Sequence, residues 1–208
     1  MDEKKLKIDG QQAAYYVGLM GACGYREKDL RKPLIGSVNS YTDVNPGHKP
    51  LKDLAGYVKE GVWAAGGTPG EFNVPAPCDG MSQGVGMHCV LPSRDLIAAS
   101  IECMARAQGF DGLAFLCSCD KIVPGMLLAA AALDLPCMFL TAGCMVPYED
   151  GEKTYVTPDL KEAIGAYNAE KISAEDLHLF KENICFSCGT CSMYARQIPW
   201  GSFPRSSG

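Results

Sequence analysis

The stretch 111–140 constrains the fold of this chain more than any other part of the sequence. The apolar run at 113–117 follows Asp111-Gly112 and has the pattern of a parallel strand buried on both faces. Strong helix formers with a proline just ahead of them fill 125–134, and a second apolar run covers 137–140. This order predicts a strand–helix–strand unit with parallel strands.

The rest of the chain continues the alternation of strands and helices. An apolar run at 34–38 is followed by a helical spacing of apolar residues over 51–65, and alternating residues at 72–76 predict a weaker strand. A helix is expected from Ser93, as its N-cap, to a stop at Gly109. Its predicted buried face consists of Leu96, Ile97, Ile101, Met104 and Ala105. We therefore predict an α/β layered sandwich with a mainly parallel sheet flanked by helices.

The charge and the apolar runs of the sequence argue against nucleic acid and membranes as partners. The formal net charge is -5 without long blocks of one sign, which gives no electrostatic reason to expect nucleic acid or an anionic membrane. The start of the chain lacks the apolar stretch of a signal peptide, and no apolar run approaches the length of a membrane span. We expect a soluble, cytoplasmic protein that acts on a small molecule.

Polar loops follow three of the predicted structured runs, at 39–48, 78–88 and 118–121. If the runs are neighbouring parallel strands, these loops share one edge of the sheet, where ligands of such sheets usually bind. The loop Ser118-Cys119-Asp120-Lys121 offers a soft metal ligand, a carboxylate and an amine. The alternative is an ordinary polar loop whose Asp120 caps the next helix.

The later part of the chain has a different pattern. Residues 153–180 predict two amphipathic helices on the surface, the second capped by Ser173 with Asp176. Two overlapping CxxC pairs follow, formed by Cys185, Cys188 and Cys191. Such spacing in a loop with Gly and Ser favours metal binding, either of zinc with Cys119 as the natural fourth ligand or of an iron–sulfur cluster.

The eleven cysteines of this chain, without a secretion signal, argue against a disulfide framework. Those outside the loops discussed above lie mainly in apolar or helical contexts. We expect them to pack in the core, as free cysteines often do. They are Cys23, Cys89, Cys103, Cys117, Cys137 and Cys144.

Several strings in this order resemble the amino-terminal part of the dihydroxy-acid dehydratase and phosphogluconate dehydratase family. The resemblance runs from about Lys32 to Tyr194, and its most specific element is the CDK-x-x-PGM string at 119–126. The other matching strings are Asn39-Ser40-Tyr41-Thr42, Pro46-Gly47-His48, Cys78-Asp79-Gly80, Leu91-Pro92-Ser93-Arg94 and Cys185-x-x-Cys188-Gly189-Thr190-Cys191.

The resemblance implies dehydration of a 2,3-dihydroxy carboxylic acid to a 2-oxo acid with an iron–sulfur cluster and Mg²⁺, as in branched-chain amino acid biosynthesis. Cys119 and Cys191 would be cluster thiolates, with Cys188 or Cys185 as additional candidates. Asp79 and Asp120 would bind Mg²⁺, and Lys121 would be the family's carbamylated lysine. A hard cation takes oxygen ligands and iron takes thiolates, so neighbouring residues can serve both metals.

Four further residues are candidates for substrate contact. Ser93 and Arg94 either orient the helix at the site or contact the substrate carboxylate, the alternative being a helix cap and a surface charge. His48 and His88 lie in the polar loops and would bond substrate oxygens if they are not simply solvated.

The chain departs from the family at the first loop. Many members have a cysteine after the proline of that loop for a [2Fe-2S] cluster, where this chain has Gly47. The third ligand must then be another cysteine, such as Cys78 or one from the triple-cysteine loop. A [4Fe-4S] cluster becomes the better expectation.

The end of the chain departs as well. We expect residues 1–194 to form a partial α/β domain and residues 195–208 to be a disordered tail unlike the family. The general base, and a glutamate ligand of Mg²⁺, would belong to a part that this chain lacks, so we expect little or no activity from the isolated chain. A homodimer is implied by the family.

Three alternatives to this function remain. A sugar-acid dehydratase of the same family is one. The second is a zinc-binding, non-enzymatic module built on the triple-cysteine loop. The third is a thiol-redox protein, although its CxxC motif is not at an early strand–helix junction.

Overall fold

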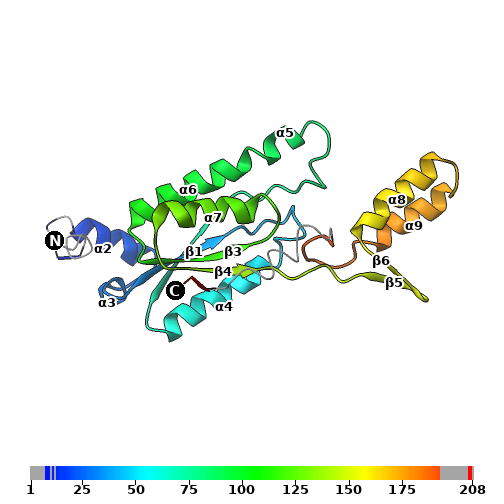
Figure 1. Ribbon diagram of the computed structural model, residues 1–208. Coiled ribbons are helices and arrows are strands. Elements are labelled where there is room, and N and C mark those ends of the chain that lie inside the picture. The colour runs from blue at the N-terminus through cyan, green and yellow to red at the C-terminus, as the bar shows by residue number, and fades with distance from the viewer. Residues whose placement is uncertain (1–7, 10, 12, 193–205, 208) are drawn as a thin grey trace.

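The computed structural model describes residues 8, 9, 11, 13–192, 206 and 207. Its central sheet contains four parallel strands in the order β2-β1-β3-β4 (Figure 1). The strands are β1 (Leu34–Asn39), β2 (Thr68–Asn73), β3 (Gly112–Cys117) and β4 (Cys137–Thr141). The short strand β7 (Ser206–Ser207) pairs antiparallel with β4. The remainder of the predicted tail, 195–205 and 208, lies outside the described residues.

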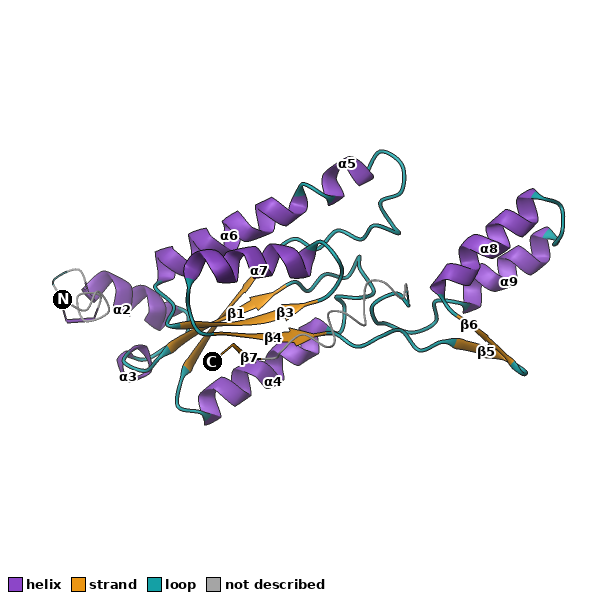
Figure 2. Ribbon diagram, in the orientation of Figure 1, coloured by secondary structure: helices purple, strands orange, loops and turns teal. Residues whose placement is uncertain are grey.

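Helices cover both faces of this sheet, as Figure 2 shows. Helix α4 (Leu51–Ala64) packs on one face, where Leu51, Ala55 and Leu116 form a small core. Helices α6 (Ser93–Gln108) and α7 (Ile122–Leu133) pack on the other, against Leu113 and Phe115. Alternate residues of β3 thus face opposite layers, as in a strand buried on both sides. The predicted α/β sandwich is confirmed.

The strand order creates a switch point between β1 and β3. From β1 the chain passes through α4 to β2 on one side, and it then returns through α6 to β3 on the other side of β1. The loops that leave β1 and β3 therefore lead to helices on opposite faces, and ligands of such sheets bind at the carboxyl ends of the strands at this kind of point. Gly47 and Cys119 lie in these two loops, and a Cβ added at Gly47 would be 3.3 Å from Cys119 Sγ.

Several local predictions need correction. The second strand begins at Thr68, earlier than the expected 72–76, and Pro69 is tolerated because β2 is an edge strand of the described sheet. Helix α6 ends at Gly109 in the left-handed region (φ 69), as predicted, but its N-cap is Pro92 and not Ser93. Leu96 is exposed on this helix, whereas Ile97, Ile101 and Ala105 are buried.

An extension of a hairpin and two helices reaches away from the sheet (Figure 1). Strands β5 (Tyr148–Asp150) and β6 (Lys153–Tyr155) pair antiparallel, and helices α8 (Thr157–Asn168) and α9 (Ala174–Asn183) follow. The two helices and the Ser173 cap are confirmed: the Ser173 side chain accepts a hydrogen bond from the Asp176 amide at 3.1 Å. The hairpin was not predicted from the sequence.

Three short or peripheral helices complete the described elements. They are α2 (Ala13–Ala22), α3 (Glu27–Leu30) and α5 (Met87–Val90). Within the described residues, none of the helices has both the length and the apolar character needed to cross a bilayer.

Candidate metal centre

Asn45 joins the loops that follow β1 and β2. Its side chain is buried, its Nδ2 donates to the Ala76 carbonyl at 3.1 Å, and its Oδ1 accepts from the Gly47 amide at 3.1 Å. A buried amide with both ends satisfied fixes the two loops relative to each other. Asn45 was not predicted as a site residue, although an Asn before Pro-Gly in a polar loop is a turn signal.

The triple-cysteine segment returns from α9 to the same edge of the sheet. The Thr190 amide donates to Gly143 O at 2.9 Å, and the Gly189 amide donates to Pro46 O at 3.0 Å. Any Cβ at Gly189 would lie 2.5 Å from the Cys144 carbonyl carbon, so only glycine fits this approach of two backbones. The GTC string therefore brings Cys191 to the loops after β1 and β4.

Ser118 strengthens this junction. Its hydroxyl and that of Thr190 form a hydrogen bond, and both side chains are buried. The loop after β3 is thereby joined to the returning segment, one residue before each of the cysteines Cys119 and Cys191.

Cys119 lies at the centre of these loops. Its backbone is left-handed (φ 63), and a Cβ placed on Gly47 would be 3.3 Å from its Sγ. Burial raises the pKa of the Cys119 thiol to about 12, and the nearby charges of Cys78 and Cys191 act in the same direction. A buried thiol of this kind ionises only when a cation compensates the charge, as a bound metal does.

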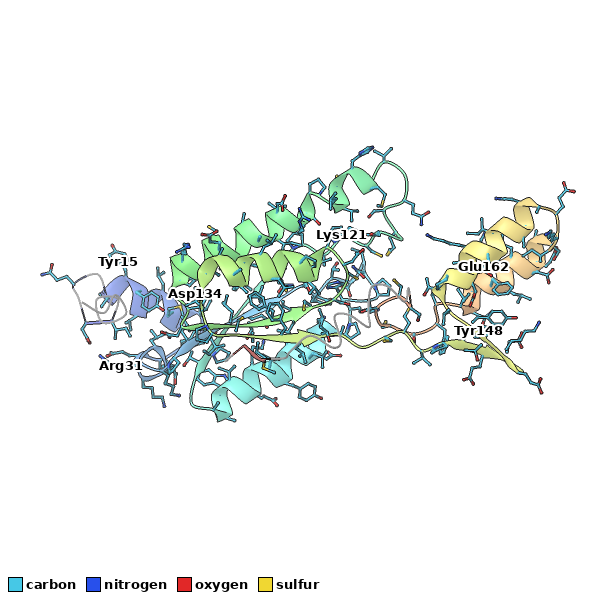
Figure 3. All side chains as sticks on the ribbon, in the orientation of Figure 1. Tyr15, Arg31, Lys121, Asp134, Tyr148 and Glu162 are labelled. Carbon is cyan, nitrogen blue, oxygen red and sulfur yellow. The ribbon has the colours of Figure 1, made fainter. Side chains whose placement is uncertain are left out.

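Lys121 draws two carboxylates together beside Cys119. Its Nζ donates to Asp79 Oδ2 at 2.7 Å and to Asp120 Oδ2 at 3.0 Å. Burial lowers the pKa of Lys121, but the hydrogen bonds to both carboxylates outweigh it and leave the pKa raised. Figure 3 shows Lys121 next to the start of α7. The alternative in which Asp120 caps this helix is wrong, because the N-cap is Lys121 and no side chain caps it.

His48 is fully buried and not a solvated loop residue. Its Nδ1 lies 2.8 Å from Ser40 Oγ, and the Ser40 hydroxyl donates to Leu116 O at 2.7 Å. Because that hydroxyl proton is already used, Nδ1 carries the ring proton, and Nε2 has no hydrogen-bond partner among the described residues. Burial lowers the pKa of His48 to about 4, against the opposing effect of the Ser40 and Ser118 backbone.

The remaining predicted residues lie apart from this centre or are held by local contacts. The Ser93 hydroxyl donates to Val90 O at 2.6 Å, Arg94 pairs with Asp95, and His88 is exposed. Cys185 and Cys188 are exposed, whereas Cys191 is partly buried. Burial raises the pKa of Cys185.

Only two of the six cysteines that were predicted to pack in the core are buried or partly buried. Cys117 is fully buried and Cys137 is partly buried, because both lie in central strands. The expectation is wrong for four that are exposed on helices or loops: Cys23, Cys89, Cys103 and Cys144. Within the described part of the chain, no three His, Cys, Asp or Glu side chains are arranged to hold a single metal ion as they stand.

Comparison with known proteins points to one family. The family model "Dihydroxy-acid/6-phosphogluconate dehydratase N-terminal" matches residues 32–196. The dihydroxy-acid dehydratase of Methanococcus vannielii is 49% identical over 175 residues, which is 84% of this chain and 32% of that protein. The enzyme of Caldicellulosiruptor bescii is 46% identical over 88% of this chain and 33% of its own length. The chain thus spans about a third of the length of these curated relatives.

Proposed function

This chain belongs to the dihydroxy-acid and 6-phosphogluconate dehydratase family of hydro-lyases, and from that premise we propose that it supplies the metal-binding part of a dehydratase. The proposed reaction removes the C2 proton and the C3 hydroxide of a 2,3-dihydroxy carboxylic acid. The enol that forms then tautomerises to the 2-oxo acid. A branched-chain precursor is the favoured substrate because the relatives named above are dihydroxy-acid dehydratases; a sugar acid is the alternative.

The observation that carries this proposal is the convergence of Asp79 and Asp120 on Lys121 beside Cys119. Two carboxylates that meet on one ammonium group form a site for positive charge. If Lys121 takes up CO₂ and releases protons, its cation becomes a carbamate anion. The three oxygen-bearing groups then suit Mg²⁺, which prefers oxygen ligands.

The neighbouring thiols suit the second cofactor. Cys119 and Cys191 would bind an iron–sulfur cluster, and Gly47 lies close to Cys119, since a Cβ added there would be 3.3 Å from Cys119 Sγ. We favour [4Fe-4S] over [2Fe-2S], since position 47 offers no thiol. The two cofactors would supply Lewis-acid assistance to loss of the C3 hydroxide and of the C2 proton.

The protein's own residues would prepare the site for this chemistry. Asp79 and Asp120 would hold the cation, and the thiolates of Cys119 and Cys191 would hold the cluster. The buried hydrogen bonds of Asn45, and the bond between Ser118 and Thr190, would keep the loops in register. Fixed positions of this kind spare the reaction the cost of reorganisation.

Other parts of the proposal concern the whole protein. We propose that the base that removes the C2 proton lies outside residues 1–194, so that the isolated chain has little or no activity. Turnover of 2,3-dihydroxyisovalerate or a sugar acid by the purified chain would refute this. We also propose a cytoplasmic enzyme and a homodimer, as the family implies.

Carbamylation of Lys121 can be tested directly. In ¹³C-bicarbonate with Mg²⁺, the chain should give a carbamate carbon resonance that Lys121→Met abolishes. Lys59→Met is the matched control, because Lys59 also pairs with a carboxylate, that of Glu71 at 2.6 Å, but lies on α4. A signal that persists in Lys121→Met, or no signal in the parent, would contradict the proposed Mg²⁺ site.

A further inference from the structure

The proposed cluster needs a thiol that the first loop does not supply. A Cβ added at position 47 would lie 3.3 Å from Cys119 Sγ, but the residue there is a glycine and has no thiol. Three other cysteines could complete the set with Cys119 and Cys191. They are Cys78, Cys185 and Cys188.

Two anchors hold the segment 76–79 against the site. On one side of Cys78, the Ala76 carbonyl accepts from Asn45 Nδ2 at 3.1 Å, and Asn45 Oδ1 lies 3.4 Å from a Cβ added at Gly47. On the other side, Asp79 Oδ2 accepts a hydrogen bond from Lys121 Nζ at 2.7 Å, and Lys121 follows Cys119 by two residues in the chain. Cys78 is therefore held between the loop after β1 and the loop after β3.

Burial separates Cys78 from its competitors. Cys78 is partly buried, like Cys119 and Cys191, whereas Cys185 and Cys188 are exposed. The thiols whose charge acts on Cys119 are those of Cys78 and Cys191. Cys185 interacts instead with Cys191 and with Thr157 at the start of α8.

We infer that Cys78 is the third thiolate ligand of the cluster, in place of the thiol that Gly47 lacks. This inference rests on the proposed iron–sulfur function. Three loops would then meet at the cluster: the loop after β2 with Cys78, the loop after β3 with Cys119, and the segment after α9 with Cys191. Cys78 and Cys191 would join Cys119 as ligands, each losing its thiol proton as it binds iron.

Anaerobic reconstitution with iron and sulfide tests the assignment. The parent chain, Cys78→Ser and Cys188→Ser are compared by bound iron, bound sulfide and visible absorption. Cys188→Ser tests the competing assignment, because it removes an exposed thiol of the triple-cysteine loop. We expect Cys188→Ser to match the parent, and Cys78→Ser to lose the visible absorption and most of the iron.

A rescue variant separates ligation from folding. Gly47→Cys in the Cys78→Ser background places a thiol against Cys119. Gly47 is not among the described glycines with positive φ, and its Cβ would lie 3.3 Å from both Cys119 Sγ and Thr190 Cα, so these neighbours have to shift by a few tenths of an ångström. We expect this double variant to regain iron and sulfide. No recovery would mean that Cys78→Ser acts through the fold, and it would overturn the inference.

The remaining outcomes are also distinguishable. If the parent itself binds no iron and sulfide, the proposed function fails. If the parent binds them and Cys78→Ser keeps the same iron content and spectrum, the proposed function stands and the assignment of Cys78 is wrong. Loss of the cluster in Cys188→Ser but not in Cys78→Ser would assign the third ligand to the triple-cysteine loop.

Discussion

The buried His48 should make the fold sensitive to acid at a pH where few other groups titrate. Burial lowers its pKa from 6.5 to about 4, so the unfolded chain binds the proton more readily than the folded one. The stability linked to this group is therefore present above pH 6.5 and is lost as the pH falls toward 4.

The size of the effect follows from the two pKa values. Linkage between 6.5 and about 4 predicts that lowering the pH from about 7 to about 5 costs about 2 kcal/mol of unfolding free energy. The carboxylates with lowered pKa values, Asp29, Glu71 and Asp176, titrate mainly below this range. The decrease in unfolding free energy between neutral pH and pH 5 therefore reflects mainly the protonation of histidine.

Urea unfolding of the metal-free chain at a series of pH values provides the measurement. His48→Asn keeps an N–H donor near Ser40 Oγ but cannot titrate, so its stability should fall less between neutral pH and pH 5 than that of the parent. His178→Asn on α9 is the matched control, because His178 is exposed, and it should keep the parent's slope. The reasoning is refuted if His48→Asn and the parent lose the same free energy over this range.

Three destabilising substitutions and one control test the packing and the helix capping described above. Gly189→Ala should cost about 1–3 kcal/mol in urea unfolding, because its Cβ would overlap the Cys144 backbone; Gly165→Ala in α8, which meets nothing within 4 Å, should not destabilise. Phe115→Ala, which removes a stacked partner of Phe139 at 4.6 Å, should cost about 3–5 kcal/mol. Ser173→Ala should cost about 1 kcal/mol through the lost cap of α9. Losses below about 0.5 kcal/mol for the destabilising changes would contradict the packing described.

The sequence predicted the layers of the fold because their signals are local. The apolar run of β3 and the helix formers of α7 need no tertiary information, and Gly109 ends α6 through its own backbone freedom. The missed hairpin had a local signal too: Gly151 and Glu152 form its two-residue turn, with φ 63 at the glycine, and a glycine at the first central position is typical of such turns.

The site was only partly predictable for a different reason. The rule that ligands bind at the carboxyl ends of parallel strands was enough to select Cys119, Asp120 and Lys121. The burial of His48 and the bridging role of Asn45 depend on which loops the strand order brings together. Local patterns in a single sequence do not predict that order. The exposure of Cys103 has a local origin, since the helical spacing of Ile97, Ile101 and Ala105 leaves position 103 on the opposite face of α6.

Metal content tests the central claim most directly. The chain is purified without oxygen, reconstituted in the presence of iron, sulfide and zinc together, and analysed for all three elements and for visible absorption. We predict a coloured protein that contains iron and sulfide and little zinc. A colourless protein that contains zinc without sulfide would contradict the dehydratase account and would favour a zinc-binding module built on Cys185, Cys188 and Cys191.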